Sequence, residues 1–239
     1  MPAVVELLAG PVDVLGEAPG IYEFDVAWEL RDCFTIRSGW SEQGRYTIHG
    51  RNLAQQLLDR LSPVIEKLSR GEVLLLRLDR IRATAEFTDE IVKNLVCSIA
   101  PESRRLKERA IVLVNPDEGT KISVHRALLA EKDACMVLET DVKPWMLSCA
   151  GKVQRNHREI LTYIRSEQET TSKDIADKFN ITPNDASTRL KELYEDGMIR
   201  RLPSISEEGK LSYVYTKFDP YLSMNPGQQV SELRYDFMK

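Results

Sequence analysis

Hydrophobic and polar positions repeat with two different periods near the start of the chain. In residues 21–30, IYEFDVAWEL, every second residue is large and apolar, which predicts a strand with one buried face. From residue 50 the apolar residues recur at steps of three and four, which predicts an amphipathic helix that ends before Gly71. Pro63 lies inside this helix and is expected to kink it or to begin a new turn.

Two continuous apolar runs, VLLLRL at 73–78 and AIVLV at 110–114, are typical of central strands covered on both faces. The residues between them have helical periodicity, with Thr84 at the N-cap position. Strand, helix and strand in this order predict a right-handed parallel crossover. A further helix at 122–133 and a strand at 135–140 complete a predicted α/β domain with a mixed sheet and helices.

A change of pattern divides the chain. Residues 141–152 contain a proline and a glycine and are predicted to hold the boundary between two domains. The first domain is expected at 1–145 and the second at 152–219. The C-terminal tail, 220–239, is interrupted by proline and glycine and is expected to become ordered with a partner.

The second domain shows three helical segments followed by a hairpin, which is the order of a winged helix-turn-helix. The third helix has Thr182 as its N-cap, Pro183 in its first turn and Gly197 after its last turn. The strands of the hairpin are MIRRL and LSYVYT. Three apolar residues share one side of the third helix and are expected to pack on the other two helices: Ala186, Leu190 and Leu193.

The opposite side of the third helix is polar and suits a nucleic acid. Small polar side chains at a helix N-terminus can approach base edges, and the helix dipole adds partial positive charge there. Basic side chains nearby can neutralise phosphates. The candidate DNA-binding residues are Asn184, Ser187, Thr188, Arg189 and Lys191 in the helix, with Arg200, Arg201 and Lys210 in the hairpin.

These residues belong to a stretch, SKDIADKFNITPNDASTRLKELYEDGMIRR, that resembles the winged helix-turn-helix of bacterial transcriptional regulators, in particular the MarR-like pattern. The resemblance implies a bacterial or phage-type regulator that binds double-stranded DNA, with Lys210 as a contact from the wing. Its markers are Ile175–Ala176, Ile181–Thr182, Ser187, Leu190, Leu193 and Gly197–Met198–Ile199.

Charge favours a second interpretation. The whole chain has a formal net charge of -4, and residues 152–219 contain 12 Lys or Arg and 12 Asp or Glu, a net charge of zero. Four of these carboxylates lie on or near the third helix: Asp185, Glu192, Glu195 and Asp196. Because winged helices also bind proteins, a non-catalytic adaptor that docks within a larger assembly is the alternative function.

The first domain carries a second resemblance. The stretch VLLLRLDRIRATAEFTDEIVKNLV resembles STAS-like domains, and the matching residues are Asp79, Thr84, Phe87, Asp89 and Glu90. In anti-sigma-factor antagonists of this class, a serine at the helix N-terminus is phosphorylated and controls partner binding. Here Ala85 stands in that place, so Thr84 and Thr88 are the nearest candidates for phosphorylation, and an N-cap role for Thr84 is the competing interpretation. The resemblance implies a domain for dimerisation, docking or signal input.

Other classes of function find little support. The stretch NPDEGTKIS at 115–123 lacks the upstream glycine of a phosphate-binding loop and is expected to be a solvated loop. The four cysteines are widely spaced and the three histidines have no cysteine nearby, so neither a metal nor another cofactor is expected. No nucleophile and base can be paired, which argues against an enzyme.

The sequence therefore predicts a cytoplasmic DNA-binding protein. No apolar run approaches the roughly 20 residues of a membrane helix, and the N-terminus lacks the basic region of a signal peptide. A single small domain usually binds DNA too weakly to specify a site, so a homodimer formed through the STAS-like domain is expected.

Overall fold

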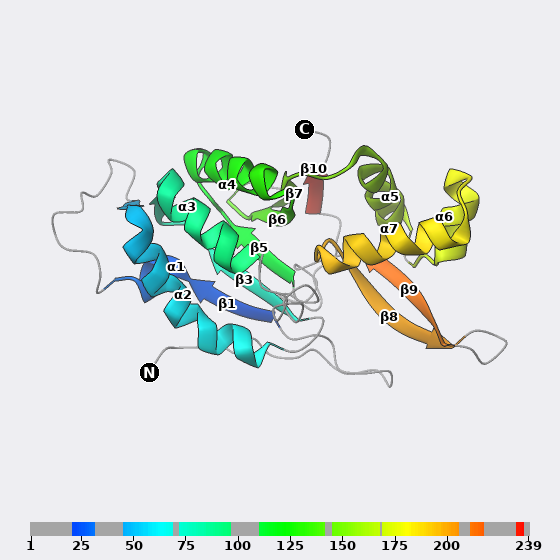
Figure 1. The fold of residues 1–239 in the computed structure, drawn as a ribbon, viewed down its shortest axis with the longest axis horizontal. Helices are drawn as coiled ribbons and strands as arrows, with labels where there is room; N and C mark the ends of the chain where they lie inside the picture. Colours follow the sequence, from blue (N-terminus) through cyan, green and yellow to red (C-terminus); the bar gives the residue numbers. More distant parts are fainter. Residues whose placement is uncertain are drawn as a thin grey trace.

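A six-stranded sheet forms the centre of the structure, a computed structural model that describes residues 21–31, 45–68, 72–96, 110–141, 145–167, 169–205, 211–217 and 233–236 (Figure 1). The strand order is β1-β3-β5-β6-β7-β10. The strands are β1 (Ile21–Asp25), β3 (Val73–Arg77), β5 (Ala110–Val114), β6 (Ala134–Glu139), β7 (Trp145–Gly151) and β10 (Leu233–Asp236).

The first four strands in this order are parallel, and β7 runs antiparallel to β6. The predicted parallel pairing of the two apolar runs, β3 and β5, is confirmed. A separate parallel pair, β2 (Tyr46–Ile48) and β4 (Ile81–Ala83), was not predicted. The helices of this part are α1 (Val26–Glu29), α2 (Gly50–Lys67), α3 (Ala85–Ile91) with the π-helical Val92–Val96, and α4 (Glu118–Glu131).

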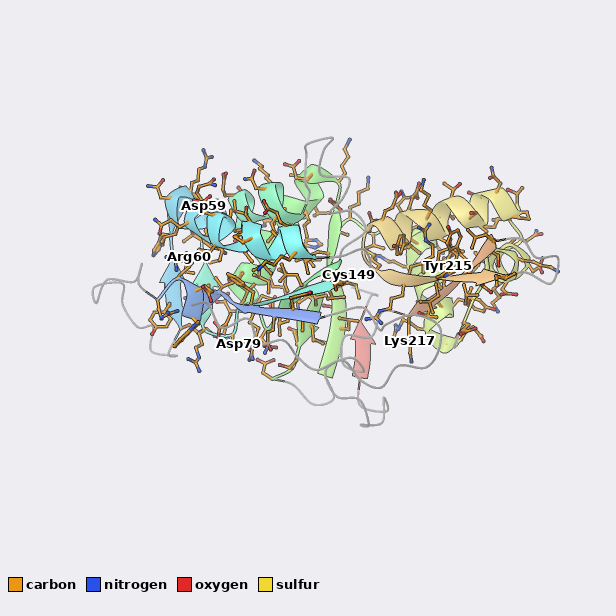
Figure 2. The ribbon with its side chains drawn as sticks, turned by 90° about the horizontal axis from the view of Figure 1, so that it is seen from below. Asp59, Arg60, Asp79, Cys149, Tyr215 and Lys217 are labelled. Carbon is orange, nitrogen blue, oxygen red and sulfur yellow. The ribbon has the colours of Figure 1, made fainter. Side chains whose placement is uncertain are left out.

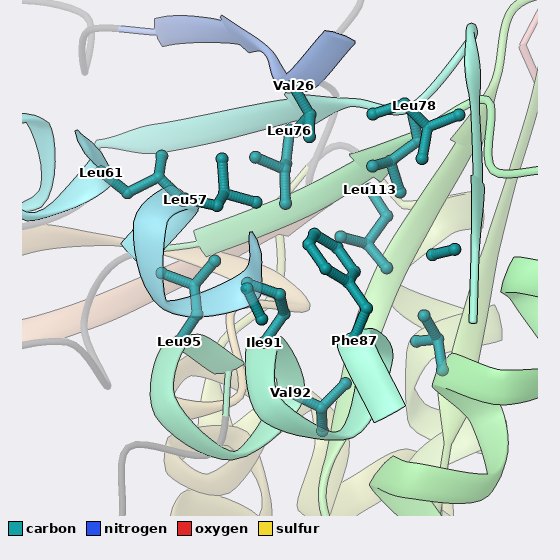
Figure 3. Packing of buried hydrophobic residues seen from close by; sticks show 14 of the residues in the cluster. Val26, Leu57, Leu61, Leu76, Leu78, Phe87, Ile91, Val92, Leu95 and Leu113 are labelled. Carbon is teal, nitrogen blue, oxygen red and sulfur yellow. The ribbon is translucent and has the colours of Figure 1, made fainter. Parts of the chain in front are cut away.

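Successive side chains along each strand lie on opposite faces of the sheet, and each face packs into a different hydrophobic core. Leu74 and Leu76 of β3 face α2, α3 and α4, whereas Val73 and Leu75 face the other way. Figure 3 shows Leu57 and Leu61 of α2, and Phe87 and Ile91 of α3, packed around Leu76 and Leu113 of the sheet. Both faces of the sheet are therefore buried, which explains the continuous apolar runs.

Two local predictions are wrong. The strand predicted over 21–30 ends at Asp25, because the Asp25 carboxylate accepts a hydrogen bond from the Trp28 amide at 3.1 Å and begins α1. The predicted loop at 115–123 is helical from Glu118, where the Asp117 carboxylate accepts from the Thr120 amide at 2.9 Å. At the exposed Pro63 no new helix begins, since α2 continues through this residue to Lys67.

Two strands extend the first domain beyond the bounds expected for it. Within 141–152, β7 continues the sheet as far as Gly151, beyond the boundary expected at residue 145. Within the tail, β10 pairs in parallel with β7 at the edge of the sheet. The chain therefore leaves the sheet at the end of β7, builds the second part and returns to the same strand.

The second part has the predicted elements of a winged helix. Its helices are α5 (Arg155–Ser166), α6 (Ser172–Phe179) and α7 (Pro183–Glu195), and its hairpin consists of β8 (Ile199–Ile205) and β9 (Leu211–Lys217). Thr171 is the N-cap of α6, where it forms a reciprocal capping box with Asp174. Thr170 adds a third short strand segment to the hairpin, since it exchanges two backbone hydrogen bonds with Tyr215.

One cluster of buried apolar side chains continues from the second face of the sheet into the winged helix. On the sheet it contains Met136 and Leu147, and in the winged helix it contains Ile160 and Leu193. Figure 2 shows Cys149 of β7 between the two parts, where its Sγ lies 3.4 Å from Sδ of Met136. Burial in this junction raises the pKa of the Cys149 thiol to about 12. The winged helix is thus packed on the sheet.

Gly151, the last residue of β7, is expected to be essential for the turn toward α5. Its φ is +93°, and a Cβ at this position would lie 2.2 Å from the Asp133 carbonyl oxygen. Replacement of Gly151 by alanine should lower the free energy of unfolding by more than about 2 kcal/mol. Urea denaturation followed by circular dichroism measures this difference.

The matched control is Gly119→Ala in α4. No atom lies closer than 3.9 Å to the added Cβ there, so this substitution should leave stability unchanged or raise it by up to about 1 kcal/mol. An unfolding midpoint of the Gly151→Ala variant equal to that of the wild type would contradict the close approach at this turn.

Candidate nucleic-acid interface

Helix α7 is fixed at both ends by the residues that the sequence indicated. Oγ1 of Thr182 accepts a hydrogen bond from the Asp185 amide at 3.2 Å, and Pro183 occupies the first turn. Gly197 follows the helix with a φ of +70°, a conformation that favours glycine. The predicted inner side is confirmed, because three side chains are completely buried: Ala186, Leu190 and Leu193.

The outer side of α7 brings together four of the predicted contact residues. Asn184, Ser187, Thr188 and Lys191 are all exposed and fall on one face of the helix. Oγ1 of Thr188 donates to the Asn184 backbone carbonyl at 3.0 Å, and the Asn184 side chain is exposed at the helix N-terminus. The face therefore has small polar groups in its first turns and one ammonium group further along.

Arg189 lies on the flank of this face and is held by a carboxylate. Its Nε and Nη2 donate to the two carboxylate oxygens of Asp185 at 3.2 and 2.8 Å, and 23% of its side chain is exposed. Lys191 is also near an acid, with its Nζ 3.7 Å from Glu195. Both basic residues of α7 are thus paired with carboxylates one turn away.

The hairpin residues occupy different environments. The Arg201 guanidinium lies 4.3 Å from the ring centre of Tyr194 in α7 and 4.4 Å from that of Tyr213 in β9. This cation–π stack fastens the hairpin to the end of α7. Arg200 is only partly exposed, and Lys210 lies outside the described residues. A phosphate contact from Arg201 would require the guanidinium to share or leave this stack.

A buried histidine, His157, links α5 to α7. Only its position three residues before Ile160 in the helical pattern could have indicated it. His157 is 5% exposed, and its Nε2 lies 3.1 Å from a carboxylate oxygen of Glu192. Burial lowers the pKa of His157, Glu192 opposes this by raising it, and Arg189 lowers it further, so the net shift is downward. The pair holds Glu192 on the inner margin of the polar face.

The two threonines considered for phosphorylation lie at the start of α3. Thr84 occupies the N-cap position, but its side chain makes no capping hydrogen bond, and its hydroxyl is buried. Thr88 is 3% exposed, and its hydroxyl faces apolar side chains. A kinase needs an exposed hydroxyl, so neither position supports a phosphorylation switch in this conformation.

Asp79, the first residue of the STAS-like resemblance, has a structural environment. Its carboxylate accepts hydrogen bonds from Nε of Arg77 at 2.7 Å and from the Asn115 amide group. Burial works to raise the pKa of Asp79, but these two hydrogen bonds outweigh it and lower the pKa. Asn115 also exchanges two hydrogen bonds with Thr140, so the network joins the ends of β3, β5 and β6.

Comparison with known proteins agrees with the geometry of the second part. A family model described as winged helix-turn-helix DNA-binding matches residues 154–200, which include α5, α6 and α7. No match was found among curated proteins or among solved structures. The chain therefore carries a domain similar to the DNA-binding winged helices. The MarR-like and STAS-like resemblances remain predictions.

Two features are absent from the described part of the chain. No helix there is long and apolar enough to cross a membrane. The same residues contain no group of three or more His, Cys, Asp or Glu side chains arranged to hold a metal ion.

The lowered pKa of His157 predicts a specific dependence of stability on pH. The unfolded chain binds a proton near the ordinary value of 6.5, whereas the folded protein binds it only at lower pH. Stability from this residue is therefore present above pH 6.5 and is lost as the pH falls below it. The free energy of unfolding should fall more steeply between pH 7 and 5 in the wild type than in His157→Gln, by up to about 1.4 kcal/mol per pH unit.

Urea denaturation at several pH values measures the two slopes. Glutamine keeps a donor for Glu192, so the comparison isolates the titration of the imidazole. Identical slopes in the two proteins would contradict a lowered pKa for His157.

Proposed function

We propose that this protein is a bacterial or phage-type transcription regulator that binds double-stranded DNA through α7 of its winged helix. The observation that supports this most strongly is the exposed polar face at the start of α7, within a segment that matches a DNA-binding winged-helix family. The inner side of α7 is used in packing, whereas its polar face is exposed among the described residues and can meet a ligand.

The proposed mode of binding follows from the helix geometry. The first turns of α7 enter the major groove, where the amide group of Asn184 and the hydroxyls of Ser187 and Thr188 meet base edges. Lys191 and Arg189 bind phosphates on either side of the groove. No catalytic step or cofactor is part of this proposal.

The proposal assigns assembly or signal input to the sheet domain. A STAS-like role is supported by the order of parallel strands and helices from β1 to β6, with α2, α3 and α4 packed in one core. A homodimer through this domain would place two copies of α7 on two half-sites and raise the affinity for a specific sequence. The reduced thiols of Cys135 and Cys149 fit a cytoplasmic protein.

The direct test is DNA binding by the full chain. Sequences selected from a random duplex pool provide the probe, and fluorescence anisotropy at a stated salt concentration measures the affinity. The double variant Asn184→Ala/Ser187→Ala should weaken binding to the selected sequence by about tenfold or more, with a much smaller effect on unrelated DNA.

Arg126→Ala provides the control, because Arg126 is an exposed arginine on α4, outside the winged helix. Its affinity for DNA should equal that of the wild type. Equal losses in both variants, or selection of no DNA by the wild type, would contradict the proposal.

The ion pair between Arg189 and Asp185 predicts that one substitution in α7 raises the affinity for DNA. Asp185 adds negative charge beside the phosphates and occupies the Arg189 guanidinium. Asp185→Asn should therefore raise DNA affinity by about threefold to tenfold and increase its dependence on salt. Asp177→Asn in α6, another exposed aspartate of the winged helix, is the comparison with the same change of charge. An Asp185→Asn affinity no higher than that of Asp177→Asn would contradict an inhibitory role for the pair.

The alternative function, a non-catalytic adaptor in a larger assembly, has one observation in its favour. The hairpin exposes four large apolar side chains: Leu202, Ile205, Leu211 and Tyr213. Purification of the full chain from its native host tests this function. Retention of a stoichiometric protein partner in the absence of DNA would favour the adaptor, and recovery of the protein alone would count against it.

A further inference from the structure

The hairpin formed by β8 and β9, here called the wing, has an apolar end that the other described residues do not cover. Ile205 and Leu211 lie directly opposite each other and are 77% and 68% exposed. Pro203 and Tyr213 also lie opposite each other, two residues further along the strands and on the same face, and both are exposed. Side chains of this kind are poorly suited to phosphates and well suited to burial against another surface.

The same end of the wing has an unpaired backbone edge. Tyr215 donates its amide to the Thr170 carbonyl at 2.7 Å and accepts from the Thr170 amide at 2.9 Å, so its backbone groups point away from β8. Along a strand, the backbone groups of every second residue point to the same side. The amides and carbonyls of Tyr213 and Leu211 therefore also point away from β8. Among the described residues none pairs with them, so β9 presents a free edge.

The sequence that joins the two strands adds no net positive charge for DNA beside this edge. Residues 206–210, which join the two strands, contain two glutamates and one lysine. The nearest described arginine, Arg201, is stacked between Tyr194 and Tyr213. A surface that combines apolar side chains with an open strand edge matches another protein strand better than it matches a phosphate backbone.

We infer that the free edge of β9 binds the same edge of a second copy of this chain, so that two wings form one four-stranded antiparallel sheet. This inference goes beyond the proposed function and does not depend on DNA. The two-fold axis passes between Ser212 of the two copies. Leu211 of each copy then lies opposite Tyr213 of the other, and both residues offer the backbone groups that such a pair needs.

This pairing is self-complementary. The two Leu211–Tyr213 pairs lie on one face of the new sheet, where they extend the apolar rows that begin with Ile205 in each copy. The contact is much smaller than the roughly 1,600 Å² of a typical stable interface. The wings therefore associate weakly and reversibly, beside any stronger contact between the sheet domains.

Cross-linking through a single cysteine tests this arrangement. In the proposed dimer, residue 212 of one copy lies opposite residue 212 of the other. Ser212→Cys therefore places two thiols at a separation that a disulfide can span. Mild oxidation of the full chain without DNA should convert it to a covalent dimer. Leu211→Lys in the same protein should slow this reaction by about tenfold or more, because it places two charges in the apolar row.

Two matched controls define the result. Ser204 lies opposite Ser212 on β8 of the same copy, so Ser204→Cys should cross-link no faster than the wild type with its native cysteines. Leu202→Lys alters an exposed leucine on the other face of the wing and should leave the Ser212→Cys reaction unchanged. Equal cross-linking at 204 and 212, no dimer from Ser212→Cys, or cross-linking only when DNA is added would overturn the inference.

Discussion

The position of α7 depends on a cluster of buried side chains that the two parts of the protein share. Met136 and Leu147 of the sheet, and Ile160 and Leu193 of the winged helix, belong to the same continuous core. Two chain connections reinforce it, because β7 leads into α5 and β10 returns to pair with β7. Packing of this kind resists bending, so the winged helix and the sheet are expected to move as one body.

Carboxylates beside the two basic residues of α7 affect how the proposed regulator would bind DNA. The polar face of α7 has the small side chains that suit a major groove, yet Arg189 and Lys191 each lie beside a carboxylate. Such pairs contribute little to stability in water, but they reduce the positive charge that would attract DNA of any sequence. In the proposed regulator, affinity would therefore depend more on base contacts and on assembly into a dimer than on net charge.

Local signals in the sequence predicted the winged helix well. Thr182, Pro183 and Gly197 determine the ends of α7 through their own backbone preferences, and the spacing of its apolar residues determines the buried side. The errors arose where structure depends on distant residues. Nothing near Leu233–Asp236 indicates that β10 pairs with β7. Period-two alternation continued past Asp25 although its carboxylate begins a helix, and the stack around Arg201 joins residues from three separate elements.

Hydrogen–deuterium exchange of the full chain, with and without the selected DNA, tests the central claim most directly, because it reports on every peptide at once. If the outer face of α7 binds DNA, exchange should slow in peptides that cover residues 182–191, and peptides from α2 should not change. Unchanged exchange across residues 182–191, under conditions in which the complex is formed, would contradict the account.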